Sequence, residues 1–180
     1  TKAFYTIGGR EVRDGGGIKP DVEVKPDSVP NIAFYLAGAR DSNEVMLNYE
    51  IDYIAKHSTI APAEEFALSD ADYDEFKERV LKADFKYDRE TEKYLKDLEK
   101  LAKFEGYYDD AKVEFEALKK KLSHNVAKDL DYNKETIKHL LENDIVAAYY
   151  YQGGAIRNSL RYDKQVKEAM KLLNSPEEYQ

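Results

Sequence analysis

The chain has 180 residues, a formal net charge of −8 and no cysteine, and 36% of its residues are charged. An acidic surface disfavours nucleic acid, which binds basic faces, and a chain without cysteine forms neither disulfides nor thiolate metal sites. No apolar run approaches the roughly 18 residues of a membrane-spanning helix, so we expect no transmembrane segment.

Residues 1–27 hold five of the nine glycines and predict a short β arm. Residues 3–7 are rich in Phe, Tyr, Thr and Ile, which favour extended backbone. Gly8-Gly9 suits a two-residue hairpin loop, because glycine adopts positive φ without steric cost, and residues 10–13 would return as the partner strand. After a second glycine-rich break, residues 18–24 again alternate apolar and polar side chains. A hairpin of this size is marginal alone, so we expect the arm to be one end of a larger sheet.

Residues 28–180 predict helices, because apolar residues recur there at spacings of three and four between capping residues. A short apolar segment, 30–39, should be buried. The longer predicted helices run from Ser42 or Asp41 to His57, from Ser69 past Val80, from Asp88 to Gly106, from Asp109 to Leu130, from Asn133 to Gly153-Gly154, and from Tyr162 to Leu173. Residues 58–68, with Pro62, should form a loop.

The predicted fold class is mainly α: an irregular multi-helix bundle with a short N-terminal β arm. We divide it into the arm, 1–27, and a helical domain, 28–180. The residues expected to face inward are Leu47, Ile51 and Ile54; Tyr73, Phe76 and Val80; Leu95, Leu98, Leu101 and Ala102; Ala111, Phe115, Leu118, Leu122, Val126 and Leu130; Ile137, Leu141, Ile145 and Ala148; and Val166, Ala169, Met170 and Leu173.

The histidines offer little metal chemistry. His57 and His124 lie far from each other and from other histidines, and no H-x-x-x-H pair occurs. Glu135, His139 and Glu142 share one helix face and could hold a metal weakly, but solvated ion pairs use this spacing far more often. We therefore expect no metal site and no cofactor.

The sequence also predicts no catalytic residues. Ser123 and His124 are neighbours on a helix, so their side chains point in different directions. No serine lies in a nucleophile turn such as G-x-S-x-G; the remaining serines fall at caps or in loops, at Ser28, Ser42, Ser58, Ser69, Ser159 and Ser175.

Three runs of like residues have ordinary structural interpretations. Gly15-Gly16-Gly17 lacks the spacing of a phosphate loop and predicts a turn between strands. Lys119-Lys120-Lys121 predicts a solvated helix face. The side chains of Tyr149-Tyr150-Tyr151 cannot all face one way, so some should be buried and some exposed, where aromatics can contact a peptide.

The β arm resembles a stretch of the C-terminal processing (tail-specific) serine proteases. That family has a short segment that closes the protease core soon after the catalytic serine and lysine. Its residues match Tyr5, Thr6, Gly9 and Arg10 of this chain, followed by Gly17, Ile18, Pro20 and Asp21. The match covers about the first 24 residues, and the helical remainder resembles the long C-terminal extension of some members.

The resemblance implies a parent enzyme that hydrolyses peptide bonds near protein C-termini with a serine nucleophile and a lysine base. A PDZ module upstream usually captures the substrate's C-terminal carboxylate, and members act mostly in the bacterial cell envelope or periplasm. No serine or lysine here matches the nucleophile or base motif. The chain would then be a non-catalytic fragment without peptidase activity of its own.

Two roles remain open for the helical domain. It could support the protease core, or contact protein or peptide substrates or an adaptor. The alternative is an independent helical module for protein binding or dimerisation. The sequence separates neither these roles nor the oligomeric states.

Overall fold

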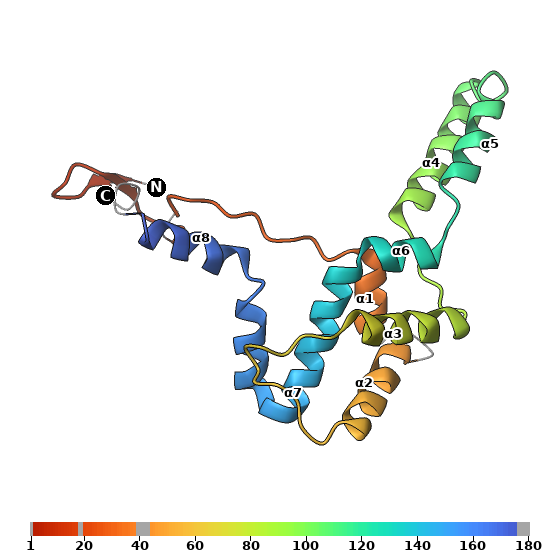
Figure 1. Ribbon diagram of the computed structural model, residues 1–180. Coiled ribbons are helices and arrows are strands. Elements are labelled where there is room, and N and C mark those ends of the chain that lie inside the picture. The colour runs from red at the N-terminus through yellow and green to blue at the C-terminus, as the bar shows by residue number, and fades with distance from the viewer. Residues whose placement is uncertain (1, 18–19, 39–43, 176–180) are drawn as a thin grey trace. The chain divides into compact units, whose positions relative to one another are not determined.

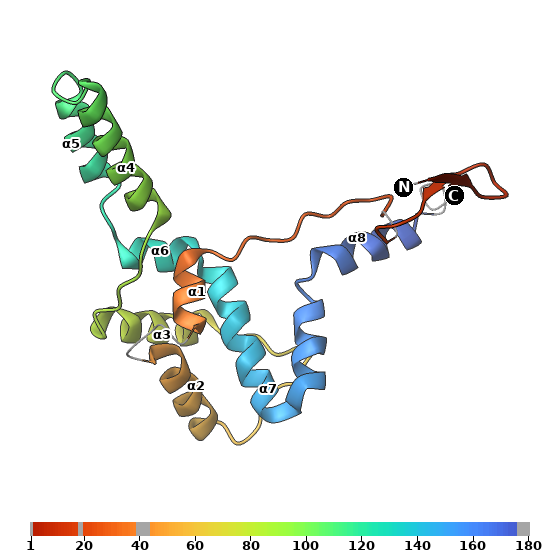
Figure 2. The same ribbon diagram turned by 180° about the vertical axis from the view of Figure 1, so that it is seen from behind.

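The computed structural model describes residues 2–17, 20–38 and 44–175. Its contacts group into two units, residues 1–27 with 164–180 and residues 28–163; Figures 1 and 2 show both from opposite sides. Helices dominate the described ranges, with eight helices and one two-stranded sheet, which confirms the predicted fold class. No helix among these ranges is both long and apolar enough to cross a bilayer.

The first unit contains the predicted hairpin. Strand β1 (Ala3–Tyr5) pairs antiparallel with β2 (Glu11–Arg13), and Phe4 lies opposite Val12. The loop between them is longer than the two residues predicted. Thr6 and Arg10 still pair, since the amide N–H of Thr6 donates to the carbonyl of Arg10 at 2.9 Å, and the turn between them includes Ile7 as well as Gly8 and Gly9. Residues 20–24 form no strand, and Ile18 and Lys19 lie outside the described residues.

Helix α8 (Lys164–Leu173) also belongs to the first unit. Its Ala169 and Leu172 and the arm residues Val22 and Val24 line a shared hollow of about 560 Å³, and Lys164 forms an ion pair with Asp27.

The inward face predicted for α8 was only partly right. Met170 and Leu173 are exposed, whereas Val166 is half-buried. The physical reason is that α8 packs on the extended arm residues around Val22 and Val24. A single extended segment covers less of the helix surface than neighbouring helices would.

The second unit holds the core. Its helices are α1 (Asn31–Ala37), α2 (Val45–Lys56), α3 (Asp70–Lys82), α4 (Glu90–Glu105), α5 (Lys112–Lys121), α6 (Val126–Tyr132) and α7 (Lys134–Leu160). Helix α7 packs on α1, α2 and α6, and α3 packs on α2 and α6. The buried apolar side chains are Ile32, Ala33, Leu36, Val45, Met46, Tyr49, Ala63, Phe66, Leu68, Tyr73, Phe76, Val80, Phe85, Leu130, Ile137, Leu141, Ile145 and Val146.

Helix α3 follows the prediction closely. The Ser69 hydroxyl accepts a hydrogen bond from the Asp72 amide at 3.1 Å, and the Asp72 carboxylate accepts one from the Ser69 amide at 3.0 Å. This reciprocal capping box satisfies two amide groups that helix geometry leaves without partners. Tyr73, Phe76 and Val80 are buried, as their spacing indicated.

Helix α2 buries a different face from the one predicted. Val45, Met46 and Tyr49 point into the core, whereas Leu47 and Ile51 are exposed. Both faces of this helix carry apolar residues at helical spacing, so periodicity alone could not choose between them. The buried face packs on α3, where the Tyr49 hydroxyl donates to the Asp72 carbonyl at 2.9 Å. The predicted caps Asp41 and Ser42, like Ala39, lie outside the described residues.

The helix predicted from Asp109 to Leu130 is two helices, α5 and α6. It breaks before Asn125, whose side chain accepts a hydrogen bond from the Lys128 amide at 3.0 Å and so starts α6. Asn competes with the helix backbone for its own hydrogen bonds, which favours caps over helix interiors. The break separates the α4–α5 pair from the core, so Leu98 and Leu101 are exposed instead of buried.

Helix α7 continues beyond Gly153-Gly154, where the sequence predicted its end. It bends sharply at Tyr151, which has φ 57° and ψ −167°, a region that is otherwise almost confined to glycine and costs about 1–3 kcal/mol. Gly154 is buried, and a β-carbon there would overlap Tyr150 and lie 3.3 Å from Val146 of the first half. Gly154 therefore serves the close approach of the two halves, whereas an added β-carbon at Gly153 would meet nothing within 4 Å. Ala148, predicted to face inward, is exposed.

Candidate functional site

The three histidines have separate surroundings. His57 stacks on Tyr53 with ring centroids 4.1 Å apart. His124 lies 3.4 Å from the Asp129 carboxylate and meets the edge of the Tyr87 ring. No three His, Asp or Glu residues of the described ranges lie close enough together to hold a metal ion.

The metal alternative on α7, Glu135 with His139 and Glu142, includes a carboxylate that has other partners. Glu142 is buried and serves a different purpose: one carboxylate oxygen accepts from the Leu68 amide at 2.9 Å, the other from the Tyr162 hydroxyl at 2.8 Å. The first of these bonds ties the 58–68 loop to α7. Burial, together with the hydrogen bond to Glu142, raises the pKa of Tyr162 to about 12. His139 stacks on the Tyr162 ring at 3.3 Å, and burial lowers its pKa.

No nucleophile and base come together within the described residues. Ser69 is used as a cap, and the Ser159 hydroxyl donates to the Ile156 carbonyl at 2.9 Å. No serine of the ranges 2–17, 20–38 and 44–175 is hydrogen-bonded to a lysine or a histidine. Ser42 lies outside these ranges. The expectation that this chain holds no catalytic residue stays a prediction.

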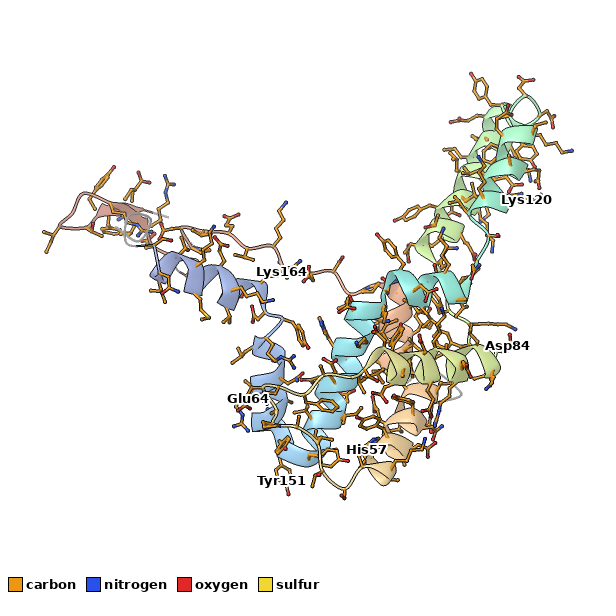
Figure 3. The ribbon with its side chains drawn as sticks, in the orientation of Figure 1. His57, Glu64, Asp84, Lys120, Tyr151 and Lys164 are labelled. Atoms are coloured by element: carbon orange, nitrogen blue, oxygen red, sulfur yellow. The ribbon has the colours of Figure 1, made fainter. Side chains whose placement is uncertain are left out.

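The lysine run has one member with a structural role. Lys119 forms ion pairs with Glu99 of α4 at 2.8 Å and with Glu116 at 3.0 Å. These bonds join α5 to α4, raise the pKa of Lys119 and lower that of Glu99 to about 2. Figure 3 shows Lys120 on the same exposed helix pair.

The tyrosine run divides between anchoring and exposure, as predicted. Tyr149 donates to the carbonyl of His57, and Tyr150 donates to the carbonyl of Ile60 at 3.1 Å. Both therefore hold the segment after α2 against α7. Tyr151 is 80% exposed at the bend, where Figure 3 labels it.

One carboxyl group of the core is strongly perturbed. Glu50 is buried on α2, and its Oε1 has no hydrogen-bond partner among the described residues. Burial, with the nearby charge of Asp144, raises the pKa of Glu50 to about 8. Helices α2 and α7 pack together, so this group sits in a structural contact and its protonation bears on stability.

The most conspicuous exposed feature is an apolar surface on the α4–α5 pair. No residue of either helix is buried. We define the hairpin surface as Tyr94, Leu98, Leu101 and Phe104 of α4 with Leu118 of α5, which are 66%, 52%, 50%, 89% and 41% exposed. Figures 1 and 2 show α4 and α5 side by side as an extended pair.

The sequence predicts that most of this surface is buried, because its spacing of three and four is the same as that of a core-facing helix. Contiguous exposed apolar patches of monomers commonly mark interaction sites. The sequence feature that indicates this exposure is the Asn125 cap, because it marks the break between α5 and α6.

Comparison with known families gives one match. Residues 32–173 match the family described as "Probable PDZ-protease, C-terminal helical domain". No curated protein and no solved structure matches the chain. The matched range runs from α1 to α8 and covers most of the chain, so this protein belongs to the family of C-terminal helical domains of probable PDZ-proteases.

Proposed function

We propose that the chain is the non-catalytic C-terminal part of a C-terminal processing serine protease. The family match supports a protease-associated role for the helices, and the arm resembles the segment that follows the serine and lysine of such enzymes. In this proposal the nucleophile, the base and the PDZ module belong to the rest of the parent enzyme, which acts in the cell envelope.

The helical domain's own task in this proposal is to hold the substrate polypeptide. The hairpin surface is the observation that carries it: its five apolar side chains are displayed on a helix pair that lies outside the core. Fully burying one such side chain is worth about 1.5–3 kcal/mol. The matching occupant is an unfolded chain, because it exposes apolar side chains that a folded substrate hides.

A direct binding experiment tests this role. The 180-residue chain is titrated with a reduced, alkylated protein that stays unfolded. We expect the double change Leu98→Asn, Leu101→Asn to weaken binding about fivefold or more. The matched control is Leu47→Asn, Ile51→Asn on α2, since these side chains are 49% and 53% exposed and the α4 pair 52% and 50%.

The outcomes separate the proposal from its alternatives. Weaker binding in the α4 variant alone supports it. Binding that is unchanged in both variants contradicts it, as does an α4 variant that only shifts a monomer–dimer equilibrium in sedimentation, which would indicate a dimerisation surface. A serine-reactive fluorophosphonate probe added to the same chain should label nothing.

A further inference from the structure

The two halves of α7 form a second feature beside the bend, an open pocket of about 410 Å³. That volume falls within the range of about 300–1,000 Å³ typical of ligand sites. Both halves of α7 contribute to its walls, which are formed by His139, Leu140, Asn143, Gln152, Ala155, Ile156, Asn158, Ser159 and Tyr162.

The lining of this pocket is chemically unusual for the chain. Although 36% of all residues are charged, no Asp, Glu, Lys or Arg lines it. Apolar wall comes from Leu140, Ala155 and Ile156, and carboxamide groups from Asn143, Gln152 and Asn158. An uncharged lining disfavours a charged ligand, because such a ligand would lose its hydration without gaining an opposite charge.

Asn158 is the most constrained of these groups. Its side-chain nitrogen donates to the carbonyls of Ala63 and Phe66 at 2.9 and 3.3 Å, which fixes the orientation of the amide. Its side-chain oxygen is buried and has no hydrogen-bond partner among the described residues. A buried acceptor without a donor is unfavourable. Because this oxygen is buried, a ligand in the pocket does not reach it, and the carboxamides open to a ligand are those of Asn143 and Gln152.

The backbone holds the pocket in a preformed shape. Tyr151 keeps a positive φ of 57° at the bend, and Gly154 lets the second half of α7 pack closely on Tyr150. Strained backbone persists where the surrounding structure determines it, and it concentrates at binding sites. Tyr149 and Tyr150 brace the same bend through hydrogen bonds to the carbonyls of His57 and Ile60 in the segment after α2.

We propose that this pocket binds a short, uncharged, extended stretch of polypeptide with apolar side chains. A carboxamide carries one acceptor and two donors, so it can pair with both the N–H and the C=O of a peptide group. A simple hydrocarbon chain would contact the apolar side chains, but it would remove water from the carboxamides without offering them hydrogen bonds, which costs free energy. This inference adds a second contact with substrate to the proposed function. Only the choice of polypeptide as the ligand rests on the proposed function.

The test uses the ¹⁵N-labelled 180-residue chain and an acetylated, amidated hexapeptide of alternating Leu and Ser. We expect the peptide to shift the side-chain NH₂ resonances of Gln152 and Asn143. Replacing Ile156→Asp should weaken binding about tenfold, and Gln152→Leu about threefold. Ile51→Asp is the matched control, because Ile51 and Ile156 are each 53% exposed, and it should leave binding unchanged.

Three results would overturn the proposal. One is the absence of peptide-induced shifts at the pocket. Another is equal weakening by Ile51→Asp. The third is a chain that binds octyl glucoside but not the peptide, with octyl glucoside binding more tightly to the Gln152→Leu variant. That result would identify an acyl-chain site. Because the hairpin surface is intact in all these variants, failure here leaves the proposed function standing, whereas a failure at the hairpin surface would leave the pocket shifts unchanged and remove only the argument for polypeptide.

Discussion

Arg10 and Asp21, eleven residues apart, form an ion pair that joins the first group of family-like arm residues, Tyr5 to Arg10, to the second, which ends at Asp21. Thr6 accepts the Arg10 amide on its hydroxyl at 3.1 Å, and Gly9 turns the chain with φ 80°. Both charged side chains are exposed, and exposed ion pairs contribute about 0–1 kcal/mol. The motif therefore orients the chain more than it stabilises it.

The glycine run of the arm should matter for the parent enzyme. Gly16 and Gly17 have φ of 146° and 80°, and an added β-carbon would meet nothing within 4 Å at either position. The expected cost of Gly16→Val, Gly17→Val is thus backbone strain alone, about 1–3 kcal/mol per residue. We expect the double variant to lower peptide turnover by the intact protease while the melting of the helical domain is unchanged.

Gly8→Ala is the control for that experiment, since Gly8 has no positive φ and an added β-carbon would meet only the Thr6 hydroxyl at 4.0 Å. Peptide turnover by the intact protease carrying Gly8→Ala should equal that of the unmodified protease. Full turnover in the valine variant would show that the glycines are a passive linker.

The two glycines of α7 should respond in opposite ways to the same substitution. Gly154→Ala would force a β-carbon into Tyr150, whereas Gly153 has open space around it. We expect Gly154→Ala to destabilise the chain by about 2 kcal/mol or more, and Gly153→Ala to stabilise it by up to about 1 kcal/mol. Urea denaturation followed by circular dichroism measures both, and equal midpoints would contradict the bend described for α7.

Burial of Glu50 predicts that stability falls as pH rises. Its pKa is raised from 4.5 to about 8 in the folded chain, by burial first and by Asp144 second. The folded state therefore binds the proton more tightly, and this contribution is complete below pH 4.5 and lost as pH rises to about 8. The slope is at most about 1.4 kcal/mol per pH unit.

Glu50→Gln should remove most of this dependence between pH 5 and 8, because the amide cannot ionise. Glu78→Gln, a change at an exposed residue of α3, should leave it in place. A parent chain whose urea midpoint does not fall over this pH range would show that Glu50 is already ionised.

How far the sequence predicts this structure depends on whether the decisive contacts are local. The Ser69 cap, the hairpin and the faces of Tyr73 and Ile137 were predictable, because neighbouring residues determine them. The face of α2 was not, since it packs on α3, where Tyr49 meets a carbonyl at Asp72, distant in sequence.

The candidate sites were harder to predict for the same reason. Leu98 and Leu101 have the spacing of core residues, and only the break before Asn125 exposes them. The α7 pocket depends on a bend at a tyrosine, where positive φ is uncommon for any residue other than glycine. Pattern reasoning placed that helix end at the nearby glycines.

Deleting residues 1–27 should leave the core intact. Every residue of the buried cluster lies between Ile32 and Val146, so the shortened chain keeps all of these contacts. We expect a cooperative melt within about 3 °C of the full chain, measured by circular dichroism. A truncated chain that is unfolded at room temperature would show that the arm is integral to the core.

Whether this domain holds polypeptide for a protease is decided by kinetics of the intact parent enzyme. Steady-state kinetics are measured with an unfolded protein substrate and with a short peptide, for the parent and for Leu98→Asn, Leu101→Asn. We predict that KM for the protein rises about fivefold, while kcat and the turnover of the short peptide stay unchanged. Equal kinetics for parent and variant, or an equal loss on both substrates, would contradict the claim.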